Sequence, residues 1–441
     1  MTQRPFLFTI VGTFVAVLGL VLSGSSLGYA APAPGPRLNP PMGWSSWSSL
    51  RGNVNATAIK AQALAMHNNL QKYGYEYVNI DSGWFSGVDE YGRTTWDANK
   101  FPDGIASVAE YVHSLGLRFG IYLVPGISAK ALAENPIIKG TRYHVRDIAD
   151  ITLPGNTIND SSVAIDYTKP GAVAYVQSQA DLLASWGVDY IKMDFVGPGG
   201  GRIPADNRDD IRHWHQAIVN TGRFMHLELS NSLSFDDASV WQRYSNGWRI
   251  DGDIECYKHC PGLTNFKVRV SLRFTDVPKW VPFAGPGHWN DLDSIMVGNG
   301  PANGLTPDER QTMLTLWSIE SAPLLLGTDL TKLDAFDLTL LTNPEVIAVD
   351  QSGHPALPVS QATKQQVWFA NNHDGSYIVA LFNLADTPAT VKATWSQMGI
   401  SGPVTARNLW TRTDLGRQSR SYSARLAPHA SQLLRVTTHQ S

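Results

Sequence analysis

The sequence predicts an α/β fold, a (β/α)8 TIM barrel followed by a C-terminal antiparallel β-sandwich. Between about residues 40 and 328, short apolar segments of strand length alternate with amphipathic segments of helix length. Such alternation is typical of a parallel sheet with helices on its outer face, and about eight repeats fit a closed barrel. After about residue 342 the helical periodicity fades, and short alternating stretches between turn residues indicate the sandwich.

Composition narrows the class of ligand. The chain has 441 residues, which is enough for one large barrel and a smaller second domain. Its net charge of −3 at pH 7 argues against nucleic acid as a partner. Charged residues make up only 17% of the chain, whereas it contains 14 Trp. Because flat aromatic faces stack well on sugar rings, this composition favours an oligosaccharide or polysaccharide.

The first residues carry the pattern of a secretory signal peptide. Arg4 precedes an apolar run over Phe6–Leu22, and small residues up to Ala30 follow it. We therefore expect residues 1–30 to be cleaved off and the protein to be secreted or periplasmic. A membrane anchor is the alternative, but the apolar run is slightly short for one, so we expect no membrane span after cleavage. Residues 31–38 form a Pro-rich linker.

The catalytic barrel is expected over residues 39–340. Its predicted strands are short and apolar: Met42–Trp47, Tyr75–Ile80, Arg118–Val124, Tyr190–Phe195, His226–Ser230, Trp248–Ile250, Trp289–Leu292 and Leu324–Gly327. Amphipathic segments between them predict helices, for example Ala56–Tyr73, Ile105–Leu115, Ala172–Trp186 and Pro307–Ser321. An open doubly wound sheet is the alternative, but no glycine-rich dinucleotide-binding turn follows the first strand.

The β-sandwich is expected over residues 341–441. Its predicted strands alternate apolar and polar residues: Val367–Ala370, Tyr377–Phe382, Ala389–Thr394 and Gln432–Val436. We expect this domain to support the barrel structurally, with an independent sugar-binding module as the alternative.

Polar and aromatic residues gather where the predicted barrel strands end, which is where a (β/α)8 barrel carries its active site. They are Trp44 and Trp47, Asp81 and Ser82, Tyr122, Lys192 and Asp194, Ser230 and Asn231, residues 248–253, and residues 289–293. Paired carboxylates beside aromatic side chains are typical of glycosidic bond cleavage. One carboxylate attacks the anomeric carbon, and the other gives a proton to the leaving oxygen. A cation such as Lys192 keeps a neighbouring nucleophile ionised.

Each of these residues has a structural alternative when it is taken alone. A single Asp at a strand end is more often a helix cap, Trp44 could belong to the core, and Lys192 could form a salt bridge at the rim. Their recurrence on successive strand ends favours a sugar-active site. A non-catalytic sugar-binding barrel is a further alternative, and the presence of two carboxylates argues against it.

Several stretches of the chain occur in the order known from one enzyme family. They are Asn39–Trp44, Tyr75–Asp81, Lys100–Ile105, Gly116–Tyr122, Tyr190–Asp194, Trp248–Asp253, Gly285–Asp293 and Ala322–Leu330. Over Asn39 to about Gln351 the chain resembles glycoside hydrolase family 27, the α-galactosidases and α-N-acetylgalactosaminidases. The resemblance implies a (β/α)8 barrel followed by an antiparallel β-domain, which agrees with the fold predicted above.

The resemblance also implies a mechanism, the retaining double displacement. Asp194 fills the position of the nucleophile, in the Lys-x-Asp motif. Asp253, four residues after Arg249, fills that of the acid/base, with Asp251 as the near competitor. The positions that grip the terminal sugar in this family correspond to Trp44, Asp81, Ser82, Tyr122, Lys192, Asn231 and Arg249. We therefore predict a secreted exo-glycosidase for terminal α-linked sugars, with α-galactosidase as the leading interpretation.

Two departures from the family pattern affect the choice of sugar. Ser82 stands where family α-galactosidases carry a second Asp, and Leu229–Ser232 replaces the usual Cys-Glu-Trp, which puts Asn231 near the position of a Glu. A pocket that loses charged hydrogen-bond partners loses discrimination at the hydroxyls they read. The alternatives are therefore the same mechanism in a β-L-arabinopyranosidase, an isomalto-dextranase-like α-glucan hydrolase or an α-N-acetylgalactosaminidase.

The chain has two Cys, Cys256 and Cys260. In an exported protein a local disulfide is the leading interpretation, with free thiols as the alternative. A metal site would need two further ligands that this spacing does not supply, so we expect no metal and no cofactor. The sequence does not indicate an oligomeric state.

Overall fold

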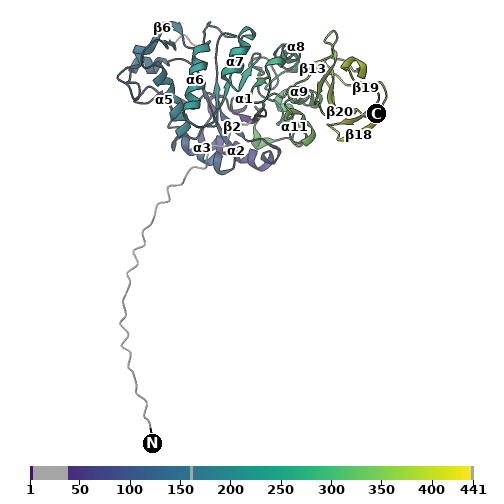
Figure 1. Cartoon of the computed structure of the whole chain (residues 1–441), viewed down its shortest axis with the longest axis horizontal. Coiled ribbons are helices and arrows are strands. Elements are labelled where there is room, and N and C mark those ends of the chain that lie inside the picture. The colour runs from purple at the N-terminus through teal and green to yellow at the C-terminus, as the bar shows by residue number, and fades with distance from the viewer. Residues whose placement is uncertain (3–37, 159–161, 439–441) are drawn as a thin grey trace. The chain divides into compact units, whose positions relative to one another are not determined.

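The computed structural model describes residues 1–2, 38–158 and 162–438 (Figure 1). Nearly all of the predicted signal peptide and of the predicted linker (residues 3–37) therefore lies outside the described residues. Residues 38–158 and 162–438 belong to one compact unit. Within the described ranges, no helix combines the length and the apolar character that crossing a membrane requires.

Eight parallel strands form the barrel, and they follow one another around it in chain order. They are β1 (Met42–Ser45), β2 (Tyr77–Ile80), β5 (Arg118–Leu123), β8 (Tyr190–Met193), β9 (His226–Leu229), β10 (Gly247–Arg249), β11 (Trp289–Asp291) and β12 (Leu324–Leu326). β12 pairs with β1, and a parallel bridge between Ile295 and Leu326 joins the chain just after β11 to β12. This bridge closes the ring, so the predicted barrel is confirmed.

The predicted barrel strands are all present, and their ends differ from the prediction by one or two residues. All residues of β1, β2 and β9 are buried. A parallel strand in a barrel is covered on both faces, which is why such strands are continuous apolar runs in the sequence. Most of the extra residues in the prediction follow the carboxyl ends of the strands, and three of them, Trp47, Asp194 and Phe195, line the cleft described below. Tyr75 and Glu76 instead precede β2.

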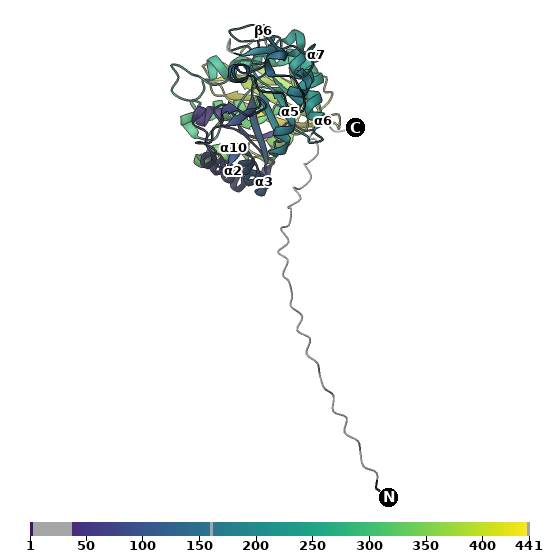
Figure 2. The same cartoon turned by 90° about the vertical axis from the view of Figure 1, so that its left-hand side faces the viewer.

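Helices cover the outside of the barrel, as α2, α3, α5, α6 and α7 show in Figure 2. The helices are α1 (Trp47–Leu50), α2 (Ala56–Asn69), α3 (Gly104–Ser114), α4 (Ala129–Glu134), α5 (Ala172–Ser185), α6 (Arg208–Asn220), α7 (Ala238–Tyr244), α8 (Ser271–Trp280), α9 (Pro307–Ile319), α10 (Ala335–Leu341) and α11 (Pro344–Asp350). Local signals fix where helices begin: Asn55 caps α2 by accepting a hydrogen bond from the Ala58 amide. Thr306 and Glu309 form a capping box at α9.

Two hairpins follow the second and third barrel strands. They are β3 (Phe85–Val88) with β4 (Thr94–Trp96), and β6 (Ala149–Pro154) with β7 (Val163–Ile165). The sequence analysis did not predict them. Both pairings contain an irregular register, and their residues are mostly half-buried or exposed, so they lack the continuous apolar signal of the barrel strands.

The C-terminal part consists of antiparallel sheets, as predicted. One sheet has the order β13 (Leu357–Pro358), β14 (Gln365–Asn371), β15 (Ser376–Asn383), β20 (Ser431–Thr438), β17 (Val404–Asn408) and β18 (Thr413–Gln418), and β16 (Ala389–Thr394) pairs with β19 (Ser421–Leu426). Val379, Val391, Trp395 and Leu434 belong to the apolar core of this part. The helix α11 lies after residue 341 and before the first strand of these sheets, so the predicted domain boundary at residue 341 stays a prediction.

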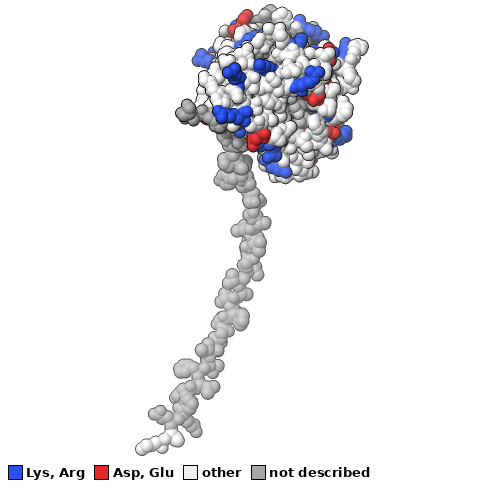
Figure 3. Space-filling view, turned by 90° about the vertical axis from the view of Figure 1, so that its right-hand side faces the viewer, with Lys and Arg blue, Asp and Glu red and all other residues white. Residues whose placement is uncertain are grey.

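Charged side chains of both signs are scattered over the face seen in Figure 3.

The barrel and the C-terminal sheets are joined by polar and apolar contacts. The ring of His429 lies between two carboxylates, with Glu309 2.6 Å from Nδ1 and Asp386 2.9 Å from Nε2. Phe274 of α8 meets Trp368 of β14 edge to face, with ring centroids 5.8 Å apart. Both aromatic residues belong to the apolar cluster that also contains the barrel core. The two parts therefore share one continuous core.

Candidate active site

A cleft of about 470 Å³ lies at the carboxyl ends of the barrel strands. The predicted site residues that line it are Asp81, Ser82, Tyr122, Lys192, Asp194, Asn231, Arg249 and Asp253. They come from five different strands or the loops that follow them. The structure thus brings together all predicted catalytic and sugar-binding residues except Trp44.

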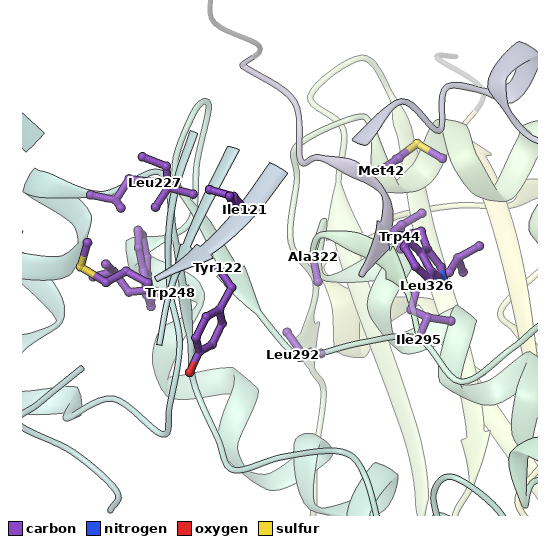
Figure 4. Close-up of a cluster of buried hydrophobic side chains, with 14 of the residues drawn as sticks. Met42, Trp44, Ile121, Tyr122, Leu227, Trp248, Leu292, Ile295, Ala322 and Leu326 are labelled. Carbon is purple, nitrogen blue, oxygen red and sulfur yellow. The ribbon is translucent and has the colours of Figure 1, made fainter. Parts of the chain in front are cut away.

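Trp44 does not line the cleft. It is fully buried, and its indole Nε1 donates a hydrogen bond to the carbonyl of Thr328 (2.7 Å). Figure 4 shows it packed near Ile295 and Leu326, among core side chains. The placement of Trp44 at the sugar pocket is therefore a misassignment: the residue lies inside β1, where its side chain packs against the neighbouring elements. Trp47, beyond the end of the strand, lines the cleft instead.

An ion pair between Lys192 and Asp81 organises the side of the cleft that carries Asp194. Lys192 Nζ lies 2.7 Å from Asp81 Oδ2. Lys192 belongs to β8, and Asp194 directly follows the last residue of that strand. Burial lowers the pKa of Lys192, but Asp81 and Asp194 more than offset this effect and raise it above its ordinary value. Burial and then Asp194 and Asp81 raise the pKa of the Tyr122 hydroxyl. Lys192 therefore stays a cation and Tyr122 a neutral donor beside the Asp194 carboxylate.

The other side of the cleft holds Asp253. Arg249 Nη2 donates to its Oδ1 (2.5 Å), and the Tyr257 hydroxyl donates to its Oδ2 (2.6 Å). Burial raises the pKa of Asp253, but Arg249, Tyr257 and Lys192 outweigh burial and bring it to about 2. Asp251, the competitor from the sequence, does not line the cleft and is paired with Arg273 (2.6 Å). The geometry favours Asp253 over Asp251 as the reacting group.

Two further carboxylates complete the cluster around Asp253: Asp293, which the sequence analysis placed among the residues at strand ends, and Glu255, which it did not single out. Asp293 lies 3.5 Å from Arg249 Nη1. Glu255 is 2% exposed, and its Oε1 accepts a hydrogen bond from Ser48 Oγ (2.5 Å). Burial, followed by Asp293 and Asp253, raises the pKa of Glu255 to about 7. Glu255 lies in the loop after β10 and Asp293 in the loop after β11. For Glu255, this place after a barrel strand was the only signal in the sequence.

The same three carboxylates are the group best placed to hold a metal ion in the described part of the chain. One oxygen from each of Asp253, Glu255 and Asp293 lies within 4.8 Å of the others. Arg249 already contacts two of the three. Because a guanidinium in this position competes with a divalent cation for the same oxygens, the cluster is better suited to protons than to a metal.

The loop after β10 carries the predicted disulfide, and the structure confirms it. Cys256 and Cys260 are bonded, with their Cα atoms 6.0 Å apart. Between them lies Tyr257, which donates to Asp253 and accepts a hydrogen bond from Trp47 Nε1 (3.0 Å). The disulfide closes a short loop around Tyr257 and so restricts the position of a direct partner of Asp253.

The residues that depart from the family pattern also lie at the cleft. Asn231 has a φ of 102°, in the left-handed region, and its amide donates to Thr157 Oγ1 (2.7 Å) and to the carbonyl of Gly200. Its side-chain donors are thus taken up by neighbouring loops. Ser82 follows Asp81 and contributes a small neutral side chain where the pattern has a second carboxylate.

A second cavity, of about 450 Å³, adjoins the cleft. Tyr122, Ile158 and Phe195 line both cavities and separate them. The rings of Phe85 and Tyr122 are parallel, with centroids 6.4 Å apart. Phe195, directly after Asp194, has a φ of 57°, so its backbone is in the left-handed region at the dividing wall.

Comparisons with known proteins cover nearly the whole described chain. The family described as Alpha galactosidase A matches residues 39–137 and 139–352, and the Alpha galactosidase C-terminal beta sandwich domain matches residues 362–436. Alpha-galactosidase 2 of Arabidopsis thaliana is 31% identical over 406 residues, which are 91% of this chain and 90% of the relative.

Solved structures agree in fold and extent. A GH27 β-L-arabinopyranosidase from Geobacillus stearothermophilus has a TM-score of 0.83 and 32% identity, covering 91% of this chain and 97% of that one. Alpha-galactosidase I from Mortierella vinacea has a TM-score of 0.73 and 27% identity, covering 91% and 98%. The chain therefore belongs to glycoside hydrolase family 27, the α-galactosidase family, and is a glycoside hydrolase.

Proposed function

We propose that the protein is a retaining exo-glycosidase that hydrolyses terminal α-linked galactose, with Asp194 as nucleophile and Asp253 as acid/base. The observation that carries the proposal is the cleft itself, where these carboxylates line one cavity with a buried Lys192–Asp81 pair between strands. Curated relatives named as alpha-galactosidases support the choice of galactose.

The proposed reaction has two steps. In the first, an Asp194 oxygen bonds to the anomeric carbon, the glycosidic bond breaks, and the leaving oxygen takes a proton from Asp253. In the second, Asp253 takes a proton from water as the water oxygen bonds to the anomeric carbon and releases Asp194. Lys192 and Tyr122 lie beside Asp194, and both can donate to sugar hydroxyls.

A second candidate sugar is favoured by particular observations. The structure most similar among those described above is a β-L-arabinopyranosidase, and Ser82 removes a carboxylate from the sugar-reading end of the cleft. A β-L-arabinopyranoside has the ring configuration of an α-galactoside without its hydroxymethyl group. The same carboxylates would therefore act on it by the same two steps.

The N-terminal pattern supports secretion or export to the periplasm, with cleavage after Ala30. We further propose that the catalytic domain spans residues 39–340 and the supporting sheet domain residues 341–441. N-terminal sequencing of protein recovered from the medium or the periplasm tests the cleavage site, and a first residue other than Ala31 would contradict it.

Turnover of 4-nitrophenyl glycosides tests the function. We expect the α-galactoside to have the highest kcat/KM in a panel with the β-L-arabinopyranoside, the α-N-acetylgalactosaminide and the α-glucoside. Proton NMR should show that the first product keeps the anomeric configuration of the substrate. Asp194→Ala and Asp253→Ala should each abolish turnover of a poorly activated substrate while the circular dichroism stays native. Inversion of configuration, or full activity in Asp194→Ala, would refute the mechanism.

A further inference from the structure

Three carboxylates and one guanidinium meet at the acid/base side of the cleft. One oxygen from each of Asp253, Glu255 and Asp293 lies within 4.8 Å of the others, and Arg249 contacts Asp253 (2.5 Å) and Asp293 (3.5 Å). Lys192, which lines the same cleft, is held at Asp81 (2.7 Å). Like charges this close cannot all persist in a site of low exposure, so the cluster retains a proton.

Glu255 is the carboxylate of the three that forms no ion pair with the residues that the structure describes. Its hydrogen-bond partner is a neutral hydroxyl, Ser48 Oγ, and it is 2% exposed. A buried carboxylate without a cationic partner is far more costly than a buried carboxylic acid. Asp253 and Asp293, in contrast, both contact Arg249. The proton of the cluster therefore resides on Glu255.

The direction of the pKa shifts agrees with this geometry. Burial, Asp293 and Asp253 raise the pKa of Glu255 to about 7, against the opposing effect of Ser48 and Lys192. Arg249 and the Tyr257 hydroxyl hold the pKa of Asp253 at about 2 despite its burial. Below about pH 7 the free enzyme thus has an ionised Asp253 beside a protonated Glu255.

An ionised Asp253 cannot protonate a leaving group, although the proposed function requires that it does. We infer that Glu255 stores the catalytic proton and delivers it to Asp253 when substrate binds, which makes Glu255 a positioning residue for the acid/base. This inference rests on the proposed function of Asp253. A gap of up to 4.8 Å between carboxylate oxygens is one that a single water molecule bridges.

The transfer is balanced. The Glu255 O–H bond breaks as an Asp253 O–H bond forms, so the charge of the cluster does not change, and Asp253 then gives the proton to the leaving oxygen. In the second step Asp253 takes a proton from the attacking water, and that proton returns to Glu255. Each turnover therefore begins and ends with the proton on Glu255.

Glu255→Gln tests the inference, because glutamine keeps the acceptor for Ser48 but carries no transferable proton. With an alkyl galactoside, whose leaving group needs protonation, we expect kcat/KM to fall about 100-fold. With the 2,4-dinitrophenyl galactoside, which leaves as a stable anion, the loss should be less than about twofold. An equal loss with both substrates, or none with either, would overturn the inference.

Glu320→Gln is the matched control. Glu320 caps the C-terminus of α9, is 1% exposed and has a pKa raised by burial, but it does not line the cleft. We expect it to leave the kinetics with both substrates unchanged. If this control reproduced the selective loss, the effect would belong to any buried carboxyl and the inference would fail.

Ser48→Ala gives a second test that keeps Glu255 in place. The hydroxyl of Ser48 stabilises the ionised carboxylate, so its loss raises the pKa of Glu255 further. The activity of the wild type should decline as the pH rises through about 7, and in Ser48→Ala this decline should move to higher pH. A decline that stays in place, or moves to lower pH, would overturn the inference.

A readout without turnover separates this inference from the proposed function. Because other buried carboxyls such as Glu320 and Asp291 also have raised pKa values, the readout is the infrared difference spectrum of the wild type minus Glu255→Gln. It should contain the band of a protonated carboxyl below pH 7, and that band should disappear as the pH rises through about 7. If the band behaves so but no glycoside in the panel is hydrolysed, the proposed function fails and the proton location stands. If Asp194 and Asp253 are essential but the band is absent, the inference alone fails.

Discussion

Trp44 and Trp47 lie three residues apart, and the structure assigns them opposite functions. Trp44 is fully buried and bonded to the Thr328 carbonyl, whereas Trp47 is partly exposed at the cleft and bonded to Tyr257. Replacing each by Phe makes the same chemical change at both sites. We expect Trp44→Phe to reduce stability and Trp47→Phe to reduce activity.

The magnitudes follow from the contacts. Trp44→Phe leaves a buried carbonyl without its donor, which costs about 1–3 kcal/mol. The smaller ring also loses buried apolar contact worth about 2 kcal/mol. The free energy of unfolding should therefore fall by about 3–5 kcal/mol. Trp47→Phe should change it by less than about 1 kcal/mol, because its side chain and its partner Tyr257 are both accessible to solvent.

Urea unfolding followed by far-ultraviolet circular dichroism measures the first quantity, and kcat/KM with the α-galactoside measures the second. We expect about a tenfold loss of kcat/KM in Trp47→Phe, or about 1.4 kcal/mol of transition-state stabilisation. Folded Trp44→Phe should stay within about threefold of the wild type, since the residue does not reach the cleft. A destabilised Trp47→Phe beside a stable but inactive Trp44→Phe would refute the assignment.

Three other outcomes are expected. With alkyl galactosides, Asp251→Asn should keep most of the wild-type activity and Asp253→Asn should lose it, because of the two residues only Asp253 lines the cleft. A lower kcat/KM in Asp251→Asn than in Asp253→Asn would instead make Asp251 the acid/base. The stability that Asp253 contributes is present above its ordinary pKa of 3.8 and is lost as the pH falls toward about 2. The urea midpoint of the wild type should therefore decline relative to that of Asp253→Asn over this pH range. If the two midpoints changed with pH in the same way, the pairing of Asp253 with Arg249 would be contradicted. Replacing Cys256 and Cys260 by Ser should raise KM several-fold, because Tyr257 is then less restrained beside Asp253. The free energy of unfolding should fall by only about 1–2 kcal/mol, since the closed loop is short. An unchanged KM would show that the disulfide does not restrain Tyr257.

The barrel could be predicted because its strands are buried on both faces. Runs such as Tyr77–Ile80 and His226–Leu229 have no exposed residue, so their apolar character marks them clearly. β18 could not be found in this way, because Thr413–Gln418 lies at the edge of its sheet and is largely exposed. Its charged and polar residues are compatible with a loop, and only pairing with β17 makes it a strand.

The site was predicted where a motif places a residue at a strand end, as for Asp194 and Arg249. The error at Trp44 arose because two Trp flank the end of β1, and the alternation of burial there depends on packing against later elements such as Ile295 and Leu326. Glu255 was missed for a different reason. It reaches the cleft only because the loop after β10 folds back onto α1, where Ser48 meets it, and a contact across 207 residues leaves no local signal.

The core that the barrel shares with the C-terminal sheets has a consequence for how the enzyme can be divided. Phe274 and Trp368 belong to one apolar cluster, and His429 joins the start of α9 to the loop after β15. A chain ending near residue 352 would expose to water the faces of α8 and α9 that contact the C-terminal sheets. The two parts should unfold in a single cooperative transition. A chimera that takes the sheet domain of a relative should fold only if the barrel residues that contact this domain are exchanged with it.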